Sequence, residues 1–293
     1  MNSSRSILIV LALILLSCSG CSTVTFGYNH ADWLLRYWVN DYTSFDSRQK
    51  KEIHDDVDDY MRWHRQNALP EYIAFLQDLD ALTRHGRAID AKDVDRTRAG
   101  INRLYRLTVT PAIRPAAHLL STLDDRQIEE LRKTLAEKNR DENKEETSGS
   151  EQENLDRRAK RYIDFAETLA GHLSTEQKQR IRQMSMRIPF ITTAYIEHRE
   201  AQQAELIALL KQHASAGEDK ISALFSQWLD APPIPVSPQA QQTLQAFDDA
   251  MNEMVVRTFD LLTAKQKEHL HQKLSGYIED FQKLHTATEI AGQ

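Results

Sequence analysis

Cysteine is nearly absent from this chain. Of its 293 residues only Cys18 and Cys21 are cysteines, so no disulfide can hold the body of the protein together. A hydrophobic content of 41% and a charged content of 27% are ordinary for a folded protein. We therefore expect a globular body that is stabilised by burial of apolar side chains.

Glycine and proline are also scarce, with nine and eight residues, and the alternating pattern typical of strands is missing. Apolar residues recur instead at spacings of three and four along most of the chain. In 46–65, for example, Ile53, Val57 and Met61 form one stripe. The sequence predicts an all-α protein, a multi-helix bundle.

The chain has no excess of positive charge. Its formal net charge is −6, which gives no electrostatic basis for binding nucleic acid. We expect no nucleic-acid partner.

Long apolar runs are missing except near the start. The run 7–16 is too short to cross a bilayer, which takes about 20 helical residues. It follows Arg5 and precedes the small residues Ser19 and Gly20 and then Cys21. This order is typical of a lipoprotein signal peptide. We expect Cys21 to be lipidated, with Cys18 as the alternative.

Lipidation would tether the mature protein permanently. One cysteine would carry more than two palmitate-type acyl chains, and two membrane-binding signals are enough for stable anchoring. Ser22 follows Cys21, where an Asp would indicate inner-membrane retention. We therefore expect the periplasmic face of the outer membrane, with the inner membrane as the alternative.

A polar stretch divides the chain. Residues 137–154 are almost devoid of apolar side chains, which predicts a flexible linker or a frayed connection. The predicted organisation is a signal peptide at 1–20, a lipidated tether at 21–27, and helical halves at 28–136 and 155–293.

Prolines and caps predict the helix boundaries. Pro70 should open a second helix that ends at Gly86, and Asp90 should cap a third. Pro111 should start a fourth, and Pro238 should follow the cap of a later one. Each proline is read here as the first residue of a helix.

One helix start recurs four times. Each copy has an apolar residue, a capping side chain, two spacers and a glutamine, which is a capping box. The first and third copies are separated by a similar distance along the chain to the second and fourth, which suggests that one half is a duplicate of the other. The alternative is that the four caps arose by convergence. The four cap and glutamine pairs are Asp46 with Gln49, Asp124 with Gln127, Ser174 with Gln177, and Thr263 with Gln266.

Two resemblances follow from these motifs. The repeated helix start resembles the signature of Spy-like periplasmic chaperones, which are small helical dimers with a concave client-binding face; this chain is about twice too long. The N-terminal block, which includes Tyr28, Trp33, Trp38, Trp63 and Tyr72, resembles an uncharacterised domain-of-unknown-function family of Gram-negative lipoproteins. That resemblance implies an anchored helical periplasmic protein and no known activity.

The aromatic segment 28–42 follows the predicted tether closely. Trp33 with Tyr37, and Leu34 with Trp38, are spaced as a buried helical stripe, so we expect the first core helix. The alternative is a helix that rests at the lipid interface, where indole and phenol rings are favoured.

Candidate chemistry is sparse. His54 and Asp58, like Asp55 and Asp59, are one helical turn apart and suit a divalent metal only if further ligands join them. We interpret this face as solvated, and His269 and His271 as surface residues. No hydrolase, nucleotide or zinc motif is present.

The sequence thus predicts a lipid-anchored, non-catalytic factor of the envelope, without catalytic residues, cofactor or metal. It would interact with or chaperone a periplasmic protein partner. The alternative is a metal- or small-ligand-binding protein, or an enzyme, that uses the Asp/His helix face. Oligomeric state is left open.

Overall fold

The computed structural model describes residues 21–84, 88–212, 217–234 and 237–291. None of them lies in a strand, so the prediction of an all-α, multi-helix protein is confirmed. No helix in these ranges is both long and apolar enough to cross a membrane. The helices are α2 (Cys21–Asn29), α3 (Ala31–Asn40), α4 (Ser47–Trp63), the π-helix η1 (His64–Ala68), α5 (Leu69–Arg84), α6 (Ala91–Ser121), α7 (Asp125–Thr147), α8 (Glu151–Ala170), α9 (Thr175–Ser185), α10 (Thr192–Leu210), α11 (Glu218–Asp230), α12 (Pro238–Leu261) and α13 (Ala264–Ala291).

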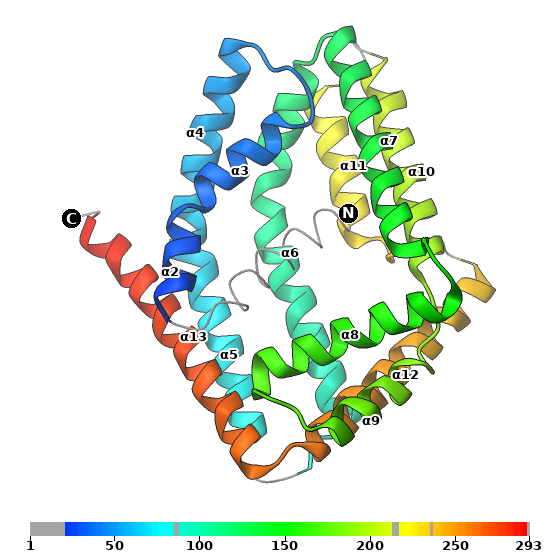
Figure 1. The fold of residues 1–293 in the computed structure, drawn as a ribbon. Coiled ribbons are helices and arrows are strands. Elements are labelled where there is room, and N and C mark those ends of the chain that lie inside the picture. Colours follow the sequence, from blue (N-terminus) through cyan, green and yellow to red (C-terminus); the bar gives the residue numbers. More distant parts are fainter. Residues whose placement is uncertain (1–20, 85–87, 213–216, 235–236, 292–293) are drawn as a thin grey trace.

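Figure 1 shows the helices as an open frame. α4 and α5 run along one side with α13, while α7, α10 and α11 stand on the other. α8, α9 and α12 close the frame at the bottom, and α6 runs lengthwise between the two sides. α6 contacts α4 and α5 on one side and α11 on the other, so it links the two sides of the frame.

The two sequence halves interlock. α13 packs most extensively on α5, α11 on α6, and α10 on α7. Each of these pairs joins a helix from before residue 148 to one from after it. The division into halves at 28–136 and 155–293 therefore describes the sequence and not separately packed units.

The hydrophobic core also contains residues from both halves of the chain. One cluster of buried apolar side chains draws on helices from α2 to α13, and a smaller one lies where α5, α12 and α13 meet. The larger cluster includes Ile53, Leu69, Ile128, Leu210 and Ile221, each no more than 3% exposed. Burial of such side chains contributes roughly 1.5–3 kcal/mol each, so the interlocked halves stabilise one another.

The prediction of a flexible linker or a frayed connection at 137–154 is wrong for most of this range. α7 continues to Thr147 and α8 begins at Glu151, so only Ser148–Ser150 lie between helices. In this stretch α7 contacts α10 through polar groups, with Asn139 donating to Gln203 at 2.6 Å. Asn139 is 5% exposed. Hydrogen-bonded polar packing orders this segment, although it lacks apolar side chains.

Pro70 does not open a separate helix. α4, η1 and α5 follow one another without a gap, and Leu69 donates its backbone N–H to the carbonyl of His64, five residues back. This wider turn accommodates a proline, because the residue at 70 has no N–H to donate and its ring needs space. The helix ends at Arg84, and Gly86 lies outside the described residues.

Pro111 does not start a helix either. α6 runs from Ala91 to Ser121 with Pro111 inside it. Hydroxyls hold the turns before the proline: Thr110 donates to the Arg106 carbonyl at 2.7 Å and Tyr60 to the Thr108 carbonyl at 3.1 Å. These bonds and the packing of α6 on α11 outweigh the proline's local preference. The predicted caps at Asp90 and before Pro238 are confirmed.

Candidate functional site

The residues proposed for lipid attachment lie at the edge of the described chain. Cys21 is the first residue of α2, and Cys18 lies outside the described residues. The tether predicted at 21–27 is helical instead, because Val24 and Tyr28 are buried, at 2% and 6% exposure, and α2 packs on α13. Any acyl chains on Cys21 would therefore begin directly at folded structure.

All four predicted capping boxes are present. In each, the cap side chain accepts the backbone N–H of the glutamine and the glutamine side chain accepts that of the cap residue. The apolar residue four positions beyond each glutamine is also buried. These residues are Ile53, Leu131, Ile181 and Leu270.

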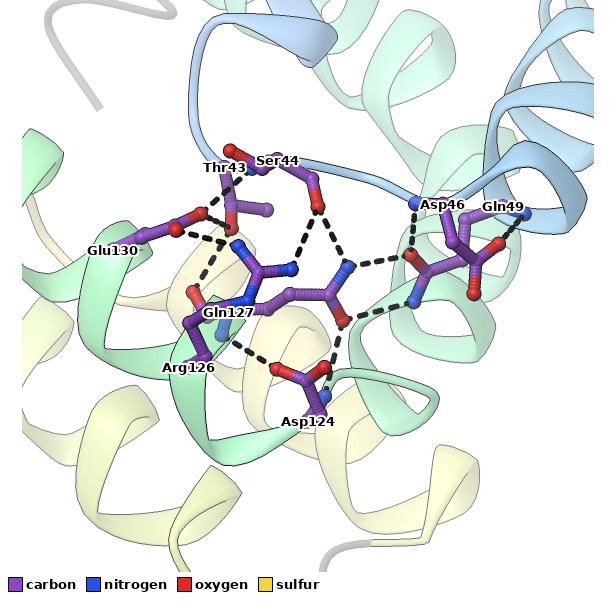
Figure 2. A network of polar contacts seen from close by, with 8 residues as sticks. All are labelled: Thr43, Ser44, Asp46, Gln49, Asp124, Arg126, Gln127 and Glu130. Atoms are coloured by element: carbon purple, nitrogen blue, oxygen red, sulfur yellow. Dashed lines mark hydrogen bonds and ion pairs between the residues drawn. The ribbon is translucent and has the colours of Figure 1, made fainter.

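The first two boxes meet, as Figure 2 shows. The Gln127 amide donates to Oε1 of Gln49 at 2.7 Å, and the Gln49 amide donates back at 3.2 Å. Gln127 also donates to the Ser44 carbonyl at 3.0 Å, and Gln49 to the Thr122 carbonyl at 3.2 Å. Ser44 lies five residues before Gln49, and Thr122 lies five residues before Gln127. This reciprocal contact, the first glutamine pair, joins the start of α4 to the start of α7.

The last two boxes repeat this arrangement. Gln177 donates to Oε1 of Gln266 at 2.7 Å and Gln266 donates back at 3.0 Å. The second bonds go to the Leu261 and His172 carbonyls, at 2.7 and 2.8 Å. This second glutamine pair joins α9 to α13. One motif thus acts four times as a cap and twice as a joint between helices.

A carboxylate braces the loop beside the first glutamine pair (Figure 2). Glu130 accepts from the Ser44 backbone N–H at 2.9 Å and from the Thr43 hydroxyl at 3.0 Å, and it pairs with Arg126 at 2.6 Å. The backbone bond from Ser44, with these other donors, lowers the pKa of Glu130 to about 2. The carboxylate therefore stays ionised and fixes the loop 43–45 against α7.

An open hollow of about 790 Å³ lies next to this loop. It is bounded by the end of α3, the loop, α4 and α7, and charged side chains of both signs line it. They are Arg36, Asp41, Lys50, His54 and Glu130. Several of these groups are already engaged, since Asp41 pairs with Lys138 at 2.5 Å and Glu130 with Arg126.

The Asp/His face of α4 holds ion pairs. His54 lies 3.2 Å from Asp58, and each of the three candidate carboxylates also has a Lys or Arg partner. Among the described residues, no three His, Cys, Asp or Glu side chains are grouped so that they could hold a metal ion. The basic partners are Lys51 for Asp55 at 2.5 Å, Arg36 for Asp58, and Arg62 for Asp59 at 2.7 Å.

His271 is not a surface residue. It is 7% exposed, and its Nδ1 lies 2.9 Å from Asp80 of α5. The interpretation of His271 as exposed is wrong because α13 packs on α5 along this stretch. His269 is exposed, as predicted.

The aromatic segment is not a buried stripe. Trp33 is 59% exposed and Tyr37 64%, and their rings stack on each other with centroids 5.7 Å apart. Leu34 is 36% exposed and Trp38 is half-buried. The residues in the core are Tyr28 and Ala31, and Leu35 and Val39 pack against it. The prediction of a buried stripe is therefore wrong for Trp33, Leu34 and Tyr37, since both faces of this segment carry apolar residues.

The π-helix η1 organises an aromatic cluster that the sequence did not indicate. The Tyr28 hydroxyl lies 2.7 Å from Nδ1 of His64, and burial lowers the pKa of His64 to about 4. Tyr72 bonds to the Thr108 hydroxyl at 2.7 Å. His285 donates to the Arg65 carbonyl at 2.9 Å, which the π-turn leaves without its usual helical donor. The neutral imidazole of His64 is thus a structural group inside this cluster.

Further apolar side chains are exposed around α8. Phe165 on α8 is 46% exposed, Phe190 is 49% and Met186 is 41%. The Arg158 guanidinium of α8 lies 4.0 Å from the Phe190 ring centroid, and it donates to the Ser185 carbonyl next to Met186 at 2.7 Å. Phe165 is seven residues, or about two turns, beyond Arg158 and so lies on the same face of α8. Exposed large apolar groups along one face are typical of interaction surfaces. We name Phe165, Met186 and Phe190 the α8 patch.

The sequence predicted the four capping boxes but not the contacts between their glutamines. Each glutamine was predicted as a local cap, and its second role depends on which helix starts lie side by side. The signal available was that all four boxes use glutamine, whose amide has donors left over after its oxygen has accepted the cap N–H. A glutamate would close the same box but could not donate to a second helix.

Comparison with known proteins gives one result. The model of the family of unknown function DUF6279 matches residues 41–230, and the chain belongs to this family. No curated protein and no solved structure matches the chain.

Proposed function

We propose that the protein is a lipid-anchored envelope factor that binds a polypeptide partner and performs no chemistry of its own. Its anchor would be the acylated Cys21, with Cys18 as the alternative, on the periplasmic face of the outer membrane. Support for the anchor comes from Arg5, the apolar run 7–16 and the small residues before Cys21.

The observation that carries the binding role is the α8 patch. Phe165, Met186 and Phe190 are each more than 40% exposed, although apolar side chains of this size gain roughly 1.5–3 kcal/mol when they are buried. A partner that covers the patch would recover part of this free energy. An extended or unfolded polypeptide suits a role in chaperoning, and a folded protein suits an envelope assembly.

The anchor is tested first, by mass spectrometry of the protein purified from membranes. We expect a polypeptide that begins at an acylated Cys21, and a Cys21→Ser variant that is released from the membrane fraction. Cys18→Ser is the matched control and should remain anchored. An unmodified N-terminus, or a precursor that stays in the cytoplasm, would refute the anchor.

The binding role is tested by photo-cross-linking in intact cells. A photoreactive phenylalanine analogue replaces Phe165 or Phe190, and an exposed control position, Gln241 on α12, carries the same group. We expect defined adducts with another polypeptide at the two patch positions and none at the control. If all three positions give the same products, the α8 patch does not bind a partner.

A second candidate function rests on the hollow beside the loop 43–45, because His54 of the Asp/His face lines it together with Arg36 and Lys50. These basic side chains suit a small anion. Thermal unfolding with and without inorganic phosphate tests this function, with His54→Ala as the variant and His269→Ala as the control. No shift with phosphate would remove this candidate.

A further inference from the structure

The exposed face of α2 and α3 carries no formal charge. Seven positions between residues 24 and 40 are exposed, and they recur every three or four residues along the two helices. None is Asp, Glu, Lys or Arg. We name this face the aromatic stripe; its residues are Phe26, Asn29, His30, Trp33, Leu34, Tyr37 and Asn40.

The neighbouring helix shows that this composition is unusual within the molecule. The exposed positions of α4 are charged or strongly polar along its whole length. Charged groups are the common solution for a helix face in water, because apolar side chains lose free energy there. The aromatic stripe departs from this rule over the two helices nearest to Cys21. The exposed charged residues of α4 include Arg48, Lys51, Asp55, Asp59 and Arg62.

The stripe is an ordered surface. Phe26 lies against His30 with ring centroids 4.2 Å apart, and Trp33 stacks on Tyr37. The opposite side of the helices is fixed to the body, because Tyr28 is buried and α3 packs on α4. The aromatic rings are therefore held outward by the fold.

Charged groups border the stripe and do not enter it. Asp32 and Arg36 pair with each other at 3.1 Å, and Arg36 also pairs with Asp58 of α4. These interactions turn both side chains of α3 toward the body of the protein. A face with apolar rings at its centre and paired charges at its edge suits the boundary between hydrocarbon and water.

The area of the stripe favours lipid over a second protein. Three aromatic side chains that are each about 60% exposed, together with Leu34, offer roughly 400 Å². A stable protein interface needs about 800 Å² from each partner. Insertion of a helix face into a bilayer has no such threshold, and it is strengthened when a second anchor is present.

We propose that the aromatic stripe lies in the interfacial layer of the membrane that holds the acyl chains. This inference rests on the lipid anchor of the proposed function. Phe26 is five residues from Cys21, or about 7.5 Å along a helix, and Tyr37 is at most about 24 Å away. Because α2 is helical from Cys21 onward, an acylated Cys21 brings the stripe to the bilayer surface. The anchor and the stripe together would fix the orientation of the frame on the membrane.

The experiment supplies the tether chemically, so that its outcome does not depend on natural lipidation. The chain that begins at Cys21 contains a single cysteine, which can be coupled to a maleimide lipid in vesicles of phosphatidylethanolamine and phosphatidylglycerol. Brominated acyl chains in these vesicles quench tryptophans that enter the bilayer. Trp33→Phe is the test variant, and Trp228→Phe on α11 is the matched control.

We expect the tethered wild-type chain to be quenched and the Trp33→Phe chain to lose most of this quenching, while Trp228→Phe retains it. An untethered Cys21→Ser chain should also bind these vesicles, about tenfold more weakly for each of Trp33 and Tyr37 that is replaced by alanine.

Equal quenching in the wild type and in Trp33→Phe would overturn the proposal. So would a concentration-dependent dimer that Tyr37→Asp abolishes, because the stripe would then be covered by a second copy. Natural lipidation is measured separately by the mass of the N-terminus. A failure of the anchor and a failure of the stripe are therefore distinguishable.

Discussion

The two glutamine pairs share one hydrogen-bond pattern and differ in their surroundings. In the first pair, Gln49 and Gln127 are 1% and 3% exposed and the caps are aspartates, whose carboxylates accept at 2.8 Å. In the second pair, Gln177 is 8% exposed and Gln266 more so. Its caps are hydroxyls that accept at 3.2 and 3.3 Å.

Because of this difference, two pairs with a similar geometry should contribute differently to the free energy of unfolding. Both pairs have the same glutamine, cap and carbonyl hydrogen bonds, but water can replace a lost contact only where it can reach the site. An unsatisfied buried polar group costs about 1–3 kcal/mol, whereas an exposed one costs little. The first pair should therefore contribute more to the stability of the fold than the second.

The largest expected effect is that of Gln127→Ala. This variant leaves the Asp124 N–H without its side-chain acceptor, and it removes one partner each from the Gln49 amide and the Ser44 carbonyl. We expect the free energy of unfolding in urea to fall by about 3 kcal/mol. Gln266→Ala should lower it by about half as much.

The exposed Gln241→Ala on α12 is the control for these two variants and should change stability by less than about 0.5 kcal/mol. Equal losses in Gln127→Ala and Gln266→Ala would contradict the view that burial sets the cost.

A double-mutant cycle isolates the contact inside each pair. Single and double alanine variants of Gln49 and Gln127 should give a coupling energy of about 1–2 kcal/mol, because the two amides contact each other directly in a buried site. The cycle on Gln177 and Gln266 should give a smaller value. Additive losses in the first cycle would mean that the glutamines act only as caps.

Removing the cap side chains should give losses of stability that differ less between the two pairs than the losses caused by removing the glutamines. Asp46→Ala is expected to lower the free energy of unfolding by about 1–2 kcal/mol and Ser174→Ala by about 1 kcal/mol, since hydrogen bonds to a carboxylate are stronger. Asp46→Asn and Ser174→Thr keep an oxygen at the cap and serve as controls. A larger loss in Ser174→Ala than in Asp46→Ala would reverse this order.

The smallest effect concerns acid pH at the first glutamine pair. The pKa of Glu130 in the folded protein is lowered to about 2, so its contribution is fully present above the unfolded value near 4.5. It is lost as the pH falls toward 2. Glu130→Gln should therefore reduce stability slightly at pH 7 and flatten the decrease between pH 4.5 and 2.

This pH effect is read from urea midpoints of both proteins at pH 7, 4 and 3. Parallel curves for the wild type and Glu130→Gln would show that Glu130 does not brace the loop 43–45.

Local chemistry was predictable from the sequence. The boxes at Asp46, Asp124, Ser174 and Thr263 and the cap before Pro238 follow from side chains within three residues of each helix start. Capping is a short-range interaction, so it needs no knowledge of the fold. The all-α class follows for the same reason.

Long-range packing was not predictable. Pro111 indicates a helix start by its own preference, yet the contacts of α6 with α11 keep the helix continuous. The composition of residues 137–147 indicates a linker. In the structure, however, Asn139 donates to Gln203 and Glu142 pairs with Arg199, both on α10. In each case a partner from far along the chain overrides the local signal.

The candidate sites show the same limit. Trp33 and Tyr37 fit a buried stripe by spacing and are exposed, because Tyr28 and Ala31 occupy the side that faces the core. Spacing identifies the faces of a helix but does not decide which one meets the core when both are apolar. That decision depends on the packing of α2 on α13 and of α3 on α4.

The π-turn at His64–Ala68 also fixes the rotational phase of everything that follows it. A π-turn amounts to one surplus residue that the widened turn absorbs, so five residues here rotate the chain about as far as four residues of an α-helix. If residues 64–68 were regular α-helix, α5 would be turned by about 100° relative to α4, away from α13. Deleting one of these residues should instead give a regular helix and keep α5 on α13, so the π-turn is the means by which the chain carries one extra position without losing the contact between its two ends.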